Sequence, residues 1–435
     1  MRKKMSSFQI ILLGFVLLII IGAILLMLPI SSKDRSFTPF IDSLFTSTSA
    51  ACVTGLVIYD TYSHWSLFGQ IVILILIQIG GLGVVTFVSS IAIISKRKIG
   101  LFERNTIKES VSAYNVGGVV KLIIFILKIT FVCEFVGFLL LLIAFCKDFG
   151  LKGAWYSLFH SISAFCNAGF DLMGDFSSLT VYYGSILVNV VITLLIIVGG
   201  IGFIVWDDIL KNKLNIKKYS LQSKVVLFTS LILIVIPFIY FMIFEFDGYS
   251  FKEKILLSFF QSVTPRTAGF NTANLNSLSA PSISIITILM LIGGSPGSTA
   301  GGFKTTTIAV LFAIIINSFK RKQTIEIAKR RIEDDVIKNA ISLVLIYSIL
   351  FFVSGVIISQ IENIELSKCL FETASAIGTV GLSLGITSSL SIASKIILMF
   401  LMFFGRVGGF TLIYATVNNL QNNVSKLPVE KIMIG

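Results

Sequence analysis

Four short segments of the sequence repeat a spacing that suits the coordination of an ion by backbone oxygens. In each segment a glycine follows a phenylalanine by ten positions and precedes Leu or Phe. The pairs are Phe45 with Gly55, Phe159 with Gly169, Phe259 with Gly269, and Phe371 with Gly381. Glycine tolerates positive φ, so consecutive carbonyls can turn toward the same side. Four such loops around one axis would form a ring of oxygens that replaces the hydration shell of a cation, which predicts a selectivity filter.

The predicted filter occupies one segment around each glycine, 52–56, 166–170, 266–270 and 378–382. Its ion-binding positions are expected at Cys52, Val53, Thr54, Gly55, Cys166, Asn167, Ala168, Gly169, Arg266, Thr267, Ala268, Gly269, Gly378, Thr379, Val380 and Gly381. A short pore helix before each segment would direct its negative C-terminal end at the ion. We expect the Arg266 side chain to clamp the filter from behind, because a positive charge beside the ion would oppose a cation.

Close packing is the alternative use of glycine in a membrane protein, since small residues let helices approach one another. It accounts for the glycine clusters that begin at Gly80 and Gly199, each inside the apolar stretch that follows a filter segment. It does not account for a fourfold spacing outside the apolar stretches. The filter interpretation is therefore favoured for the four loop glycines, and both uses stay open for the clusters.

A third cluster interrupts the apolar stretch 281–319. The run and its flank contain Gly293, Gly294, Ser295, Gly297, Ser298, Thr299, Gly301, Gly302 and Lys304. Glycine costs about 1 kcal/mol and proline about 3 kcal/mol in a helix interior relative to alanine, so 293–302 should form an irregular loop. Irregular backbone at membrane depth needs a cavity to line. Directly below the filter such a loop would obstruct the pore, and we predict that it is the gate.

Arg406 lies inside the last apolar stretch, where a central arginine costs at least ~2.5 kcal/mol. Two roles follow from an inward-facing guanidinium: hydrogen bonds to carbonyls of the broken loop, or an electrostatic barrier below the filter. A packing arginine that reaches the interface is the alternative. We assign Arg406 to the predicted gate.

The composition indicates the elements that must position these residues. Mean hydropathy is +0.94, with 55% hydrophobic and only 13% charged residues, so this is a membrane chain. About 20 helical residues cross a bilayer core. The apolar stretches predict eight spans, at 8–30, 67–95, 119–146, 181–210, 224–246, 281–319, 338–361 and 391–418. The fold class is therefore an all-α polytopic membrane protein with eight spans and four re-entrant pore helices around a central pore of pseudo-fourfold symmetry.

The net charge of +13 is concentrated on one side of the expected membrane. Basic residues gather at the N-terminus, at 96–108, 211–224 and 320–338, and near the C-terminus, while the intervening loops hold fewer. The positive-inside rule then places both termini in the cytoplasm of a multi-pass cell-membrane protein. The chain divides into four repeats: 1–110, 111–219, 220–333 with its broken second helix at 293–303, and 334–435 with a C-terminal tail.

Enzyme and metal chemistry are poorly supported. The string Gly293 to Gly297 matches G-x-S-x-G and so allows an intramembrane serine protease, but His64 and His160 are both expected near the outer face, away from Ser295. The same two histidines and five cysteines give neither transition-metal spacing nor a disulfide framework. We therefore expect no catalytic residue. A sodium-coupled cation symporter is the more serious alternative to a pore, since symporters also contain broken helices and repeats.

Acidic residues lie around the predicted filter. Asp60, Asp171 and Asp175 follow the first two filter segments and would either concentrate cations in an outer vestibule or act as ordinary solvated loop acids. Asp42 and Glu372 fall on or near pore helices, where either would anchor a loop.

The assembled motifs resemble a known family. CVTGLVIYDT, SAFCNAGF, SVTPRTAGFNT, GTVGLS, GGSPGSTAGGFKT and FFGRVGG are similar to those of the Trk/Ktr/HKT superfamily of potassium transporters, especially the bacterial KtrB subunits, over almost the whole chain. The motif 293–305 carries the most specific match. Two cysteines in the filter region, Cys52 and Cys166, depart from the family pattern.

The resemblance implies potassium uptake, often sodium-stimulated, by a homodimer with one pore per protomer. It further implies a cytosolic KtrA-like ring of nucleotide-binding regulatory subunits that binds ATP or ADP and controls loop 293–302. It also implies that K⁺ is the transported ion, with no cofactor in this chain, and that Gly55 favours potassium, because sodium-carrying members often have serine at this position. Residues 430–435 resemble a family tail that packs into the partner protomer.

Overall fold

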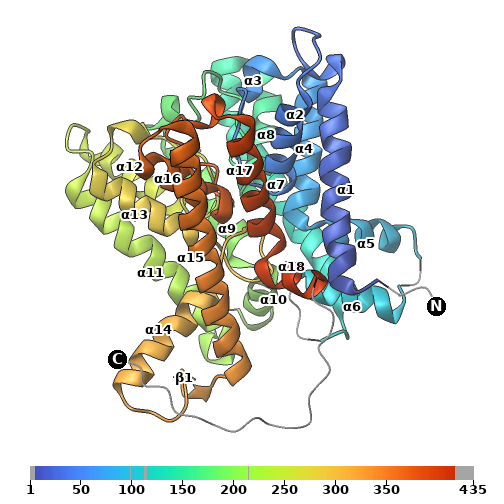
Figure 1. Cartoon of the computed structure of the whole chain (residues 1–435), viewed down its shortest axis with the longest axis vertical. Helices are drawn as coiled ribbons and strands as arrows, with labels where there is room; N and C mark the ends of the chain where they lie inside the picture. The colour runs from blue at the N-terminus through green and yellow to red at the C-terminus, as the bar shows by residue number, and fades with distance from the viewer. Residues whose placement is uncertain (1–4, 98, 112–114, 214, 417–435) are drawn as a thin grey trace.

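The computed structural model describes residues 5–97, 99–111, 115–213 and 215–416. Four of its helices are long and apolar enough to cross a membrane: α1 (Ser7–Met27), α7 (Val119–Phe149), α11 (Leu221–Phe244) and α15 (Asp334–Glu362). Each packs against the shorter helix that follows it: α2 (Phe40–Ala51), α8 (Lys152–Phe165), α12 (Phe251–Val263) and α16 (Leu366–Gly378). The short helices lie together in the upper half of the molecule (Figure 1).

A second apolar helix follows each short helix and is broken in every case. The broken pairs are α4 (Leu67–Leu82) with α5 (Val84–Ile94), α9 (Ile186–Ile201) with α10 (Phe203–Asn212), α13 (Ala280–Leu291) with α14 (Thr305–Phe319), and α17 (Ile392–Val407) with α18 (Gly409–Thr416). The smaller elements are α3 (Thr61–His64), α6 (Leu101–Ser110), the hairpin β1 (Glu326–Ile327) with β2 (Arg330–Arg331), and 3₁₀ turns at Pro29–Ser31, Thr180–Tyr182, Ile216–Lys218, Leu275–Ser277 and Thr387–Ser389.

Three of the breaks were not expected from the sequence. In the predicted span 391–418, α17 ends before Gly408, which has a φ of +90°. The stretches 67–95 and 181–210 were predicted as straight spans, but the chain turns by 93° after α4 and by 95° after α9. Gly83 and Gly202 occupy these corners with φ of +83° and +99°, a conformation that cannot continue a right-handed helix. Counted by length and composition over the described residues, the chain has four spans, or six if each bent pair is one span.

A serine caps the N-terminus of each of the helices α4, α9, α13 and α17 in the same way. The hydroxyls of Ser66, Ser185, Ser279 and Ser391 each accept a hydrogen bond from the amide three residues later. Such a cap satisfies one of the free amides of the first turn. In the last two units a carboxylate adds to the cap: Glu245 accepts from the Ser279 amide at 3.1 Å, and Glu362 accepts from the Ser391 amide at 3.0 Å. Because these acids end α11 and α15, they join the two helices of a unit at one end.

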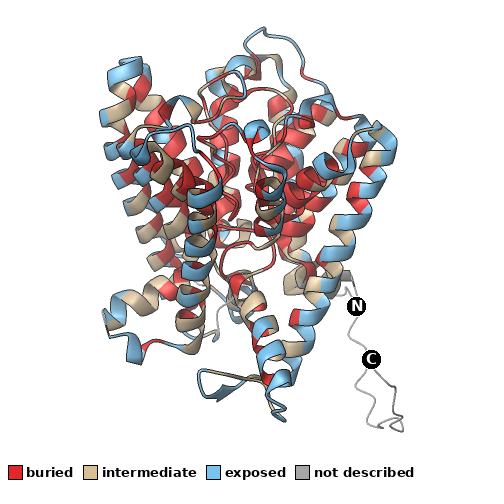
Figure 2. Cartoon of the chain, turned by 90° about the vertical axis from the view of Figure 1, so that its left-hand side faces the viewer, coloured by how far each residue is buried: buried red, intermediate tan, exposed pale blue. Residues whose placement is uncertain are grey.

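Buried residues lie in the interior of the molecule and exposed residues lie on the outer faces of its helices (Figure 2). Many of the exposed residues of α1, α7, α11 and α15 are large and apolar. Phe45, Phe159 and Phe371 are fully buried, whereas Phe259 is partly exposed and its neighbour Phe260 is buried instead. Many serine and threonine side chains are buried while large apolar side chains are exposed, a distribution that suits a protein surrounded by lipid.

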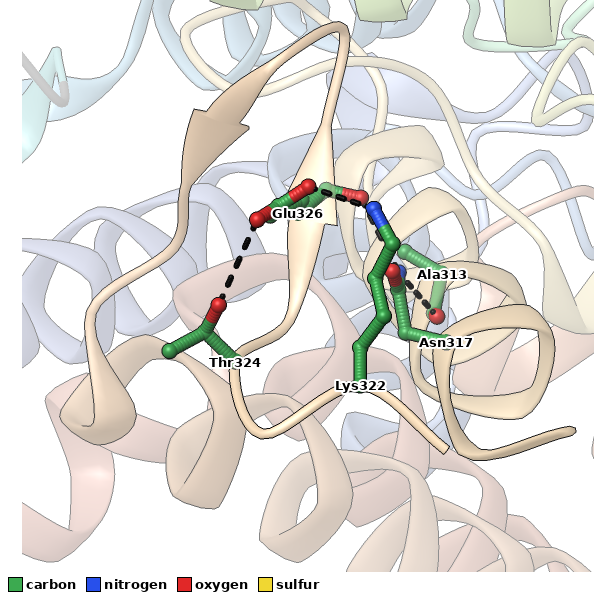
Figure 3. A network of polar contacts seen from close by, with 5 residues as sticks. All are labelled: Ala313, Asn317, Lys322, Thr324 and Glu326. Atoms are coloured by element: carbon green, nitrogen blue, oxygen red, sulfur yellow. Dashed lines mark hydrogen bonds and ion pairs between the residues drawn. The ribbon is translucent and has the colours of Figure 1, made fainter. Parts of the chain in front are cut away.

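The hairpin between α14 and α15 is fastened to the end of α14 (Figure 3). Asn317 donates from its amide nitrogen to the carbonyls of Ala313 at 2.8 Å and Glu326 at 3.0 Å. The Glu326 carboxylate accepts from Lys322 at 2.6 Å and from the Thr324 hydroxyl at 3.4 Å. A compact turn therefore connects α14 to α15.

Candidate functional site

Each predicted filter segment begins at the end of a short helix and directs its amides back to that helix. The Thr54 amide donates to the Ser49 carbonyl at 2.8 Å, and the Ala168 amide donates to the Ser163 carbonyl at 2.7 Å. The Val380 amide likewise donates to the Ser375 carbonyl at 2.8 Å. In the third segment the Ala268 amide donates to Thr264 at 3.0 Å. The hydrogen-bond donors of all four segments are thus turned toward their own helices.

The backbone of the four segments shares an alternating conformation. Each glycine has a positive φ, at +95° for Gly55, +69° for Gly169, +79° for Gly269 and +94° for Gly381. The residue two positions before it also has a positive φ in every segment: Val53 (+57°), Asn167 (+60°), Thr267 (+69°) and Thr379 (+51°). This conformation is uncommon outside glycine and costs of order 1–3 kcal/mol, more readily tolerated by Asn than by a β-branched residue. Four repetitions of this cost indicate a functional requirement.

The four glycines stand next to one another in a closed ring. A Cβ on Gly55 would lie 2.5 Å from the Ala168 carbonyl oxygen, and one on Gly169 would lie 2.8 Å from the Ala268 oxygen. Likewise, a Cβ on Gly269 would collide with the Val380 oxygen, and one on Gly381 with the Thr54 oxygen. The first segment therefore touches the second, the second the third, the third the fourth, and the fourth the first.

The carbonyls of this ring are available to a ligand. Within the part of the chain that the structure describes, the oxygens of Thr54, Ala168, Ala268 and Val380 accept no hydrogen bond from another protein group. Buried carbonyls without partners are rare because the lost hydrogen bond to water costs free energy. A dehydrated cation at the centre of the ring would supply the missing partner.

Hydroxyl groups in the short helices hold the segments in place, and sequence reasoning missed them. The Ser49 hydroxyl accepts from the Gly55 amide at 3.0 Å, and the Ser375 hydroxyl accepts from the Gly381 amide at 3.0 Å. Ser163 donates to the Phe170 carbonyl at 2.7 Å, and Thr264 also donates to the Phe270 carbonyl. A serine four residues after the phenylalanine recurs in three of the four repeats and was a visible signal.

Three of the four filter segments begin with a residue whose side chain is buried. Arg266 is 7% exposed and donates to the Ser230 hydroxyl of α11 at 3.1 Å, behind the third segment. The Cys52 and Cys166 thiols are buried and free. Among the described residues no group of His, Cys, Asp and Glu is arranged to hold a metal ion.

A cavity of about 240 Å³ opens above the ring of glycines. All four glycines line it, together with Asp60, Asp171, Phe176, Asn271 and Thr387 among others. The Asp60 carboxylate is held by the amides of Ser63 (2.7 Å) and Phe176 (3.1 Å). Of the three acids that the sequence suggested, Asp60 and Asp171 face this vestibule, whereas Asp175 is exposed elsewhere and does not line it.

The two acids near the short helices both anchor loops. Asp42 accepts from Tyr59, four residues beyond Gly55, at 2.8 Å and pairs with Lys395 of α17 at 2.8 Å. Glu372 accepts from the Thr387 hydroxyl. Tyr59 also stacks on His64, with ring centroids 4.2 Å apart. The segment that follows the first filter segment is thus connected to α17 through Asp42.

Removing Lys395 is expected to destabilise the protein. The Lys395 and Asp42 side chains are 11% and 12% exposed, so Lys395→Met leaves a carboxylate buried without its cation, at a cost of about 3 kcal/mol. Adding Asp42→Asn should recover most of that loss, because a buried pair removed as a whole costs little. Thermal unfolding of the single and double variants in detergent measures this; equal stability of all four proteins would show that the pair does not hold the loop.

The predicted gate forms a closed loop directly below the ring. The Gly293 amide donates to the Phe303 carbonyl at 2.9 Å, which brings the two ends of the loop together. The loop is joined to α9 and α10 by three hydrogen bonds: Ser295 to Gly200 (2.9 Å), Thr299 to Gly199 (3.3 Å) and Phe203 to Gly297 (2.8 Å). A Cβ on Gly301 would collide with the Thr379 side chain of the fourth filter segment. No side chain larger than hydrogen fits between loop and filter at this point.

Two basic side chains satisfy carbonyls of the loop. Lys304 donates to Ala300 at 2.7 Å and to Gly301 at 3.4 Å. Arg406, from α17, donates to the Thr299 carbonyl on one side and to the Gly80 and Gly81 carbonyls of α4 on the other, the last at 2.9 Å. The guanidinium therefore bridges the loop to a helix of the first quarter of the chain.

Of the two uses that the sequence left open for the glycine clusters, close packing is the one that the contacts support, and a second role, ending a helix, was not expected. A Cβ on Gly80, Gly199 or Gly405 would collide with the last carbonyls of α2, α8 or α16, so these glycines permit close packing behind the filter. Gly83, Gly202 and Gly408, three positions later, have positive φ and end the helices. The serine in the G-x-S-x-G string has no histidine partner: Ser295 hydrogen-bonds to Thr305 at 3.1 Å, while His160 bonds to Tyr156 at 2.8 Å.

Known proteins resemble this chain over its length. Residues 2–426 match the family model TrkH, described as a cation transport protein. The chain is 40% identical to the potassium/sodium uptake protein NtpJ of Enterococcus hirae, over 100% of this chain and 98% of that protein. It is 39% identical to the Ktr system potassium uptake protein B of Bacillus subtilis, over 96% and 94%. The potassium transporter TrkH from Vibrio parahaemolyticus has a similar fold, with a TM-score of 0.73 at 20% identity over 96% of this chain and 86% of that one.

Proposed function

This chain belongs to the TrkH family of cation transport proteins, and from that premise we propose that it carries potassium into the cell through a filter of backbone carbonyls. The family consists of transport proteins rather than enzymes, and the chain is a multi-pass membrane protein. The observation that carries the proposal is the closed ring of Gly55, Gly169, Gly269 and Gly381, whose neighbouring carbonyls lack protein partners.

The proposed architecture is four repeats of helix, pore helix and broken helix, eight spans in all, at 1–110, 111–219, 220–333 and 334–435. Repeated contacts support it: the four long helices each pack against a short one, and each second helix begins with a capping serine. The bent helices α4 and α9 and the loop between α13 and α14 are then second spans that stop below the filter. Both termini lie in the cytoplasm in this arrangement, because the basic segments fall on one side.

Loop 293–302 is the proposed gate. It lies in contact with the fourth filter segment through Gly301 and Thr379, so an ion leaving the ring must displace it. Its links to α9, Arg406 and Lys304 are all hydrogen bonds to backbone carbonyls or amides, which can break one at a time. Gly297, in the middle of the loop, and Gly302, at its end, have positive φ and give the loop conformational freedom.

The proposed assembly is a homodimer regulated by a cytosolic KtrA-like ring that binds ATP or ADP. Relatives named as parts of a Ktr system in Bacillus subtilis and Vibrio alginolyticus support a multi-subunit system. The segment 430–435, expected to pack against the partner protomer, lies outside the described residues. Sodium acts as an activator or a second cargo in this proposal, since one relative is named for potassium and sodium uptake.

The test is uptake in a potassium-requiring host that lacks its own uptake systems, with and without a cytosolic regulator. A pore moves potassium down its electrochemical gradient, so uptake should follow membrane potential and continue in sodium-free medium, at a reduced rate if sodium is an activator. The runner-up, a sodium-coupled symporter, predicts a fixed coupling of potassium to sodium and no flux without it. Absence of potassium flux in both media from correctly inserted protein would contradict both functions.

Acid outside the cell is expected to slow this uptake. The pKa of the Asp171 carboxyl is raised to about 7, chiefly by burial; a hydrogen bond from the Met173 amide opposes this shift, and the nearby Asp60 carboxylate adds to it. A group with this pKa gains a proton as the pH falls through about 7, so the vestibule loses negative charge and uptake should fall about threefold.

Asp171→Asn should give the low rate at every pH, because it removes the titrating charge. Asp175→Asn is the matched control: it removes an acid from the same loop that does not line the cavity and should keep the pH step. A pH step of equal size in Asp171→Asn and the wild type would rule out this group.

A further inference from the structure

A second cavity lies on the outside of the helix bundle, away from the filter and the gate. It has a volume of about 620 Å³ and lies between α4, α7 and α8. Its apolar residues are Leu74, Ile75, Phe131, Val132, Phe135, Phe138, Leu158 and Ile162, and the polar residues Gln78 and Glu134 complete it. Phe131, Val132 and Phe135 are each about 60% exposed on the face that the bilayer covers. The groove is therefore reached from lipid and not from water.

Glu134 gives this groove an unusual chemistry. It lies at the middle of the 31-residue helix α7 and is 5% exposed. None of the ion pairs in the described part of the chain includes it. Its carboxyl oxygen lies 3.9 Å from the Cys166 thiol and also interacts with the side-chain amide of Gln78, and neither of these groups carries a positive charge. An ionisable side chain at such a depth is costly to retain without a function.

Three phenylalanines surround the same groove on α7. Phe131 and Phe138 lie three residues before and four residues after Glu134, which places them on its face of the helix. The rings of Phe135 and Phe138 are 6.3 Å apart. Aromatic faces attract ammonium groups, and quaternary ammonium ligands are recognised by cages of such rings. A carboxyl without a cation, beside aromatic faces in an apolar groove, is complementary to a cation carried on a hydrophobic chain.

We propose that this groove is a binding site for lipophilic amines, with Glu134 as the counter-ion and Phe131, Phe135 and Phe138 as the apolar and aromatic walls. The amine enters from the bilayer as the free base. Its nitrogen takes the proton from the Glu134 carboxylic acid, so an ammonium and a carboxylate form together and the net charge of the site does not change. The alkyl chain lies along Leu158 and Ile162. Because Glu134 and Gln78 both contact Cys166, an occupant would lie directly behind the second filter segment.

Carbodiimide labelling tests the proposal without reference to transport. The full-length protein in lipid nanodiscs is treated with dicyclohexylcarbodiimide, which adds a protonated carboxyl across its C=N bond, and the adduct at Glu134 is measured by peptide mass spectrometry. N,N-dimethyldodecylamine, a tertiary amine that cannot form an amide, should lower labelling about tenfold by taking the proton and filling the groove. Dodecanol, with the same chain and no basic nitrogen, should leave labelling nearly unchanged.

Variants of the groove lining distinguish the contribution of the wall residues to amine binding from that of the Glu134 carboxyl. Phe135→Leu keeps an apolar wall but loses one aromatic face, so protection by the amine should weaken about threefold. Leu158→Trp, on α8, should fill the groove and reduce labelling. Ile143→Trp, on α7 at a lipid-exposed position outside the groove, should not. Glu372, fully buried away from the groove, is the internal control and should stay unlabelled. Equal protection by dodecanol and the amine, or no labelling of Glu134 at all, would overturn the proposal.

Discussion

Serine at position 55 is expected to abolish most of the preference for potassium over sodium. Gly55 has a φ of +95°, and any Cβ there would lie 2.5 Å from the Ala168 carbonyl oxygen, closer than a real contact allows. The second segment must move outward, and the carbonyls of the ring then no longer fit a dehydrated potassium ion. We expect the ratio of potassium to sodium uptake to fall about tenfold, equivalent to about 1.4 kcal/mol of lost discrimination.

The matched control for this variant is Gly118→Ser. Gly118 has a φ of +86°, close to that of Gly55, but a Cβ there meets no atom within 4 Å. It therefore carries the same backbone strain without contact with the ring. Competition between rubidium and sodium uptake measures both variants. Wild-type selectivity in Gly55→Ser, or an equal loss in Gly118→Ser, would remove the filter from segment 52–56.

Replacing Arg406 is expected to release the gate. The guanidinium connects the loop carbonyl of Thr299 with the α4 carbonyls of Gly80 and Gly81, and a single ammonium cannot donate in both directions with the same geometry. Arg406→Lys keeps the charge but loses the bridge. If the bridge is the function, Arg406→Lys and Arg406→Ala should both raise potassium flux in the absence of a regulator, by about tenfold for a lost charge-assisted pair of hydrogen bonds.

This comparison also decides between the two roles that the sequence left open. An electrostatic barrier predicts that Arg406→Lys behaves like the wild type and that only Arg406→Ala conducts faster. The bridge predicts that both variants conduct faster. Flux into proteoliposomes, with oligomeric state checked by gel filtration, distinguishes them; unchanged flux in both variants would exclude Arg406 from gating.

Shortening the loop provides an independent test of the gate. Deleting 297–301 removes the contact of Gly301 with Thr379 and the bond of Thr299 to Gly199. Unregulated flux should rise, because nothing then lies against the underside of the ring. Deleting part of the hairpin 326–331 is the control, since it shortens a turn far along the chain from the loop. Flux that stays at the wild-type level, or disappears, in folded protein would count against the gate.

The position of the ring could be predicted because its glycines have no substitute. Gly169 and Gly269 combine a positive φ with a neighbouring carbonyl where a side chain would have to be, so every repeat shows the same residue at the same spacing. The irregular loop could be predicted for a similar reason, since no helix accommodates the run from Gly293 to Gly302. In both cases the backbone needs a conformation that only certain residue types, chiefly glycine, can adopt, so the residue types themselves indicate the structure.

The positive φ of the residue two positions before each filter glycine could not be predicted from the sequence. Val53 and Thr379 are β-branched and prefer extended backbone, so their positive φ opposes local preference. It is imposed from outside the segment: amides such as those of Thr54 and Val380 bond back to the helices while the adjoining carbonyls remain in the ring. Only the assembled structure contains that constraint.

The bends after α4 and α9 and the ion pair between Asp42 and Lys395 also could not be predicted from the sequence. Gly80 and Gly83 look alike in the string GGLG, yet the first permits contact with the end of α2 and the second turns the chain by 93°. Hydrophobic periodicity does not separate a packing glycine from a turning one. Asp42 and Lys395 are 353 residues apart, and nothing local to either indicates the other.

Crystals grown in rubidium salts, measured at the rubidium absorption edge, show whether the carbonyls of the four filter segments coordinate an ion. If these carbonyls form the filter, we expect an anomalous peak on the axis of the ring. It should lie within coordination distance of the carbonyl oxygens of Thr54, Ala168, Ala268 and Val380. Sodium added in excess should not displace this peak. A well-ordered ring with no ion between these oxygens, or four segments that lie apart from one another, would contradict the account.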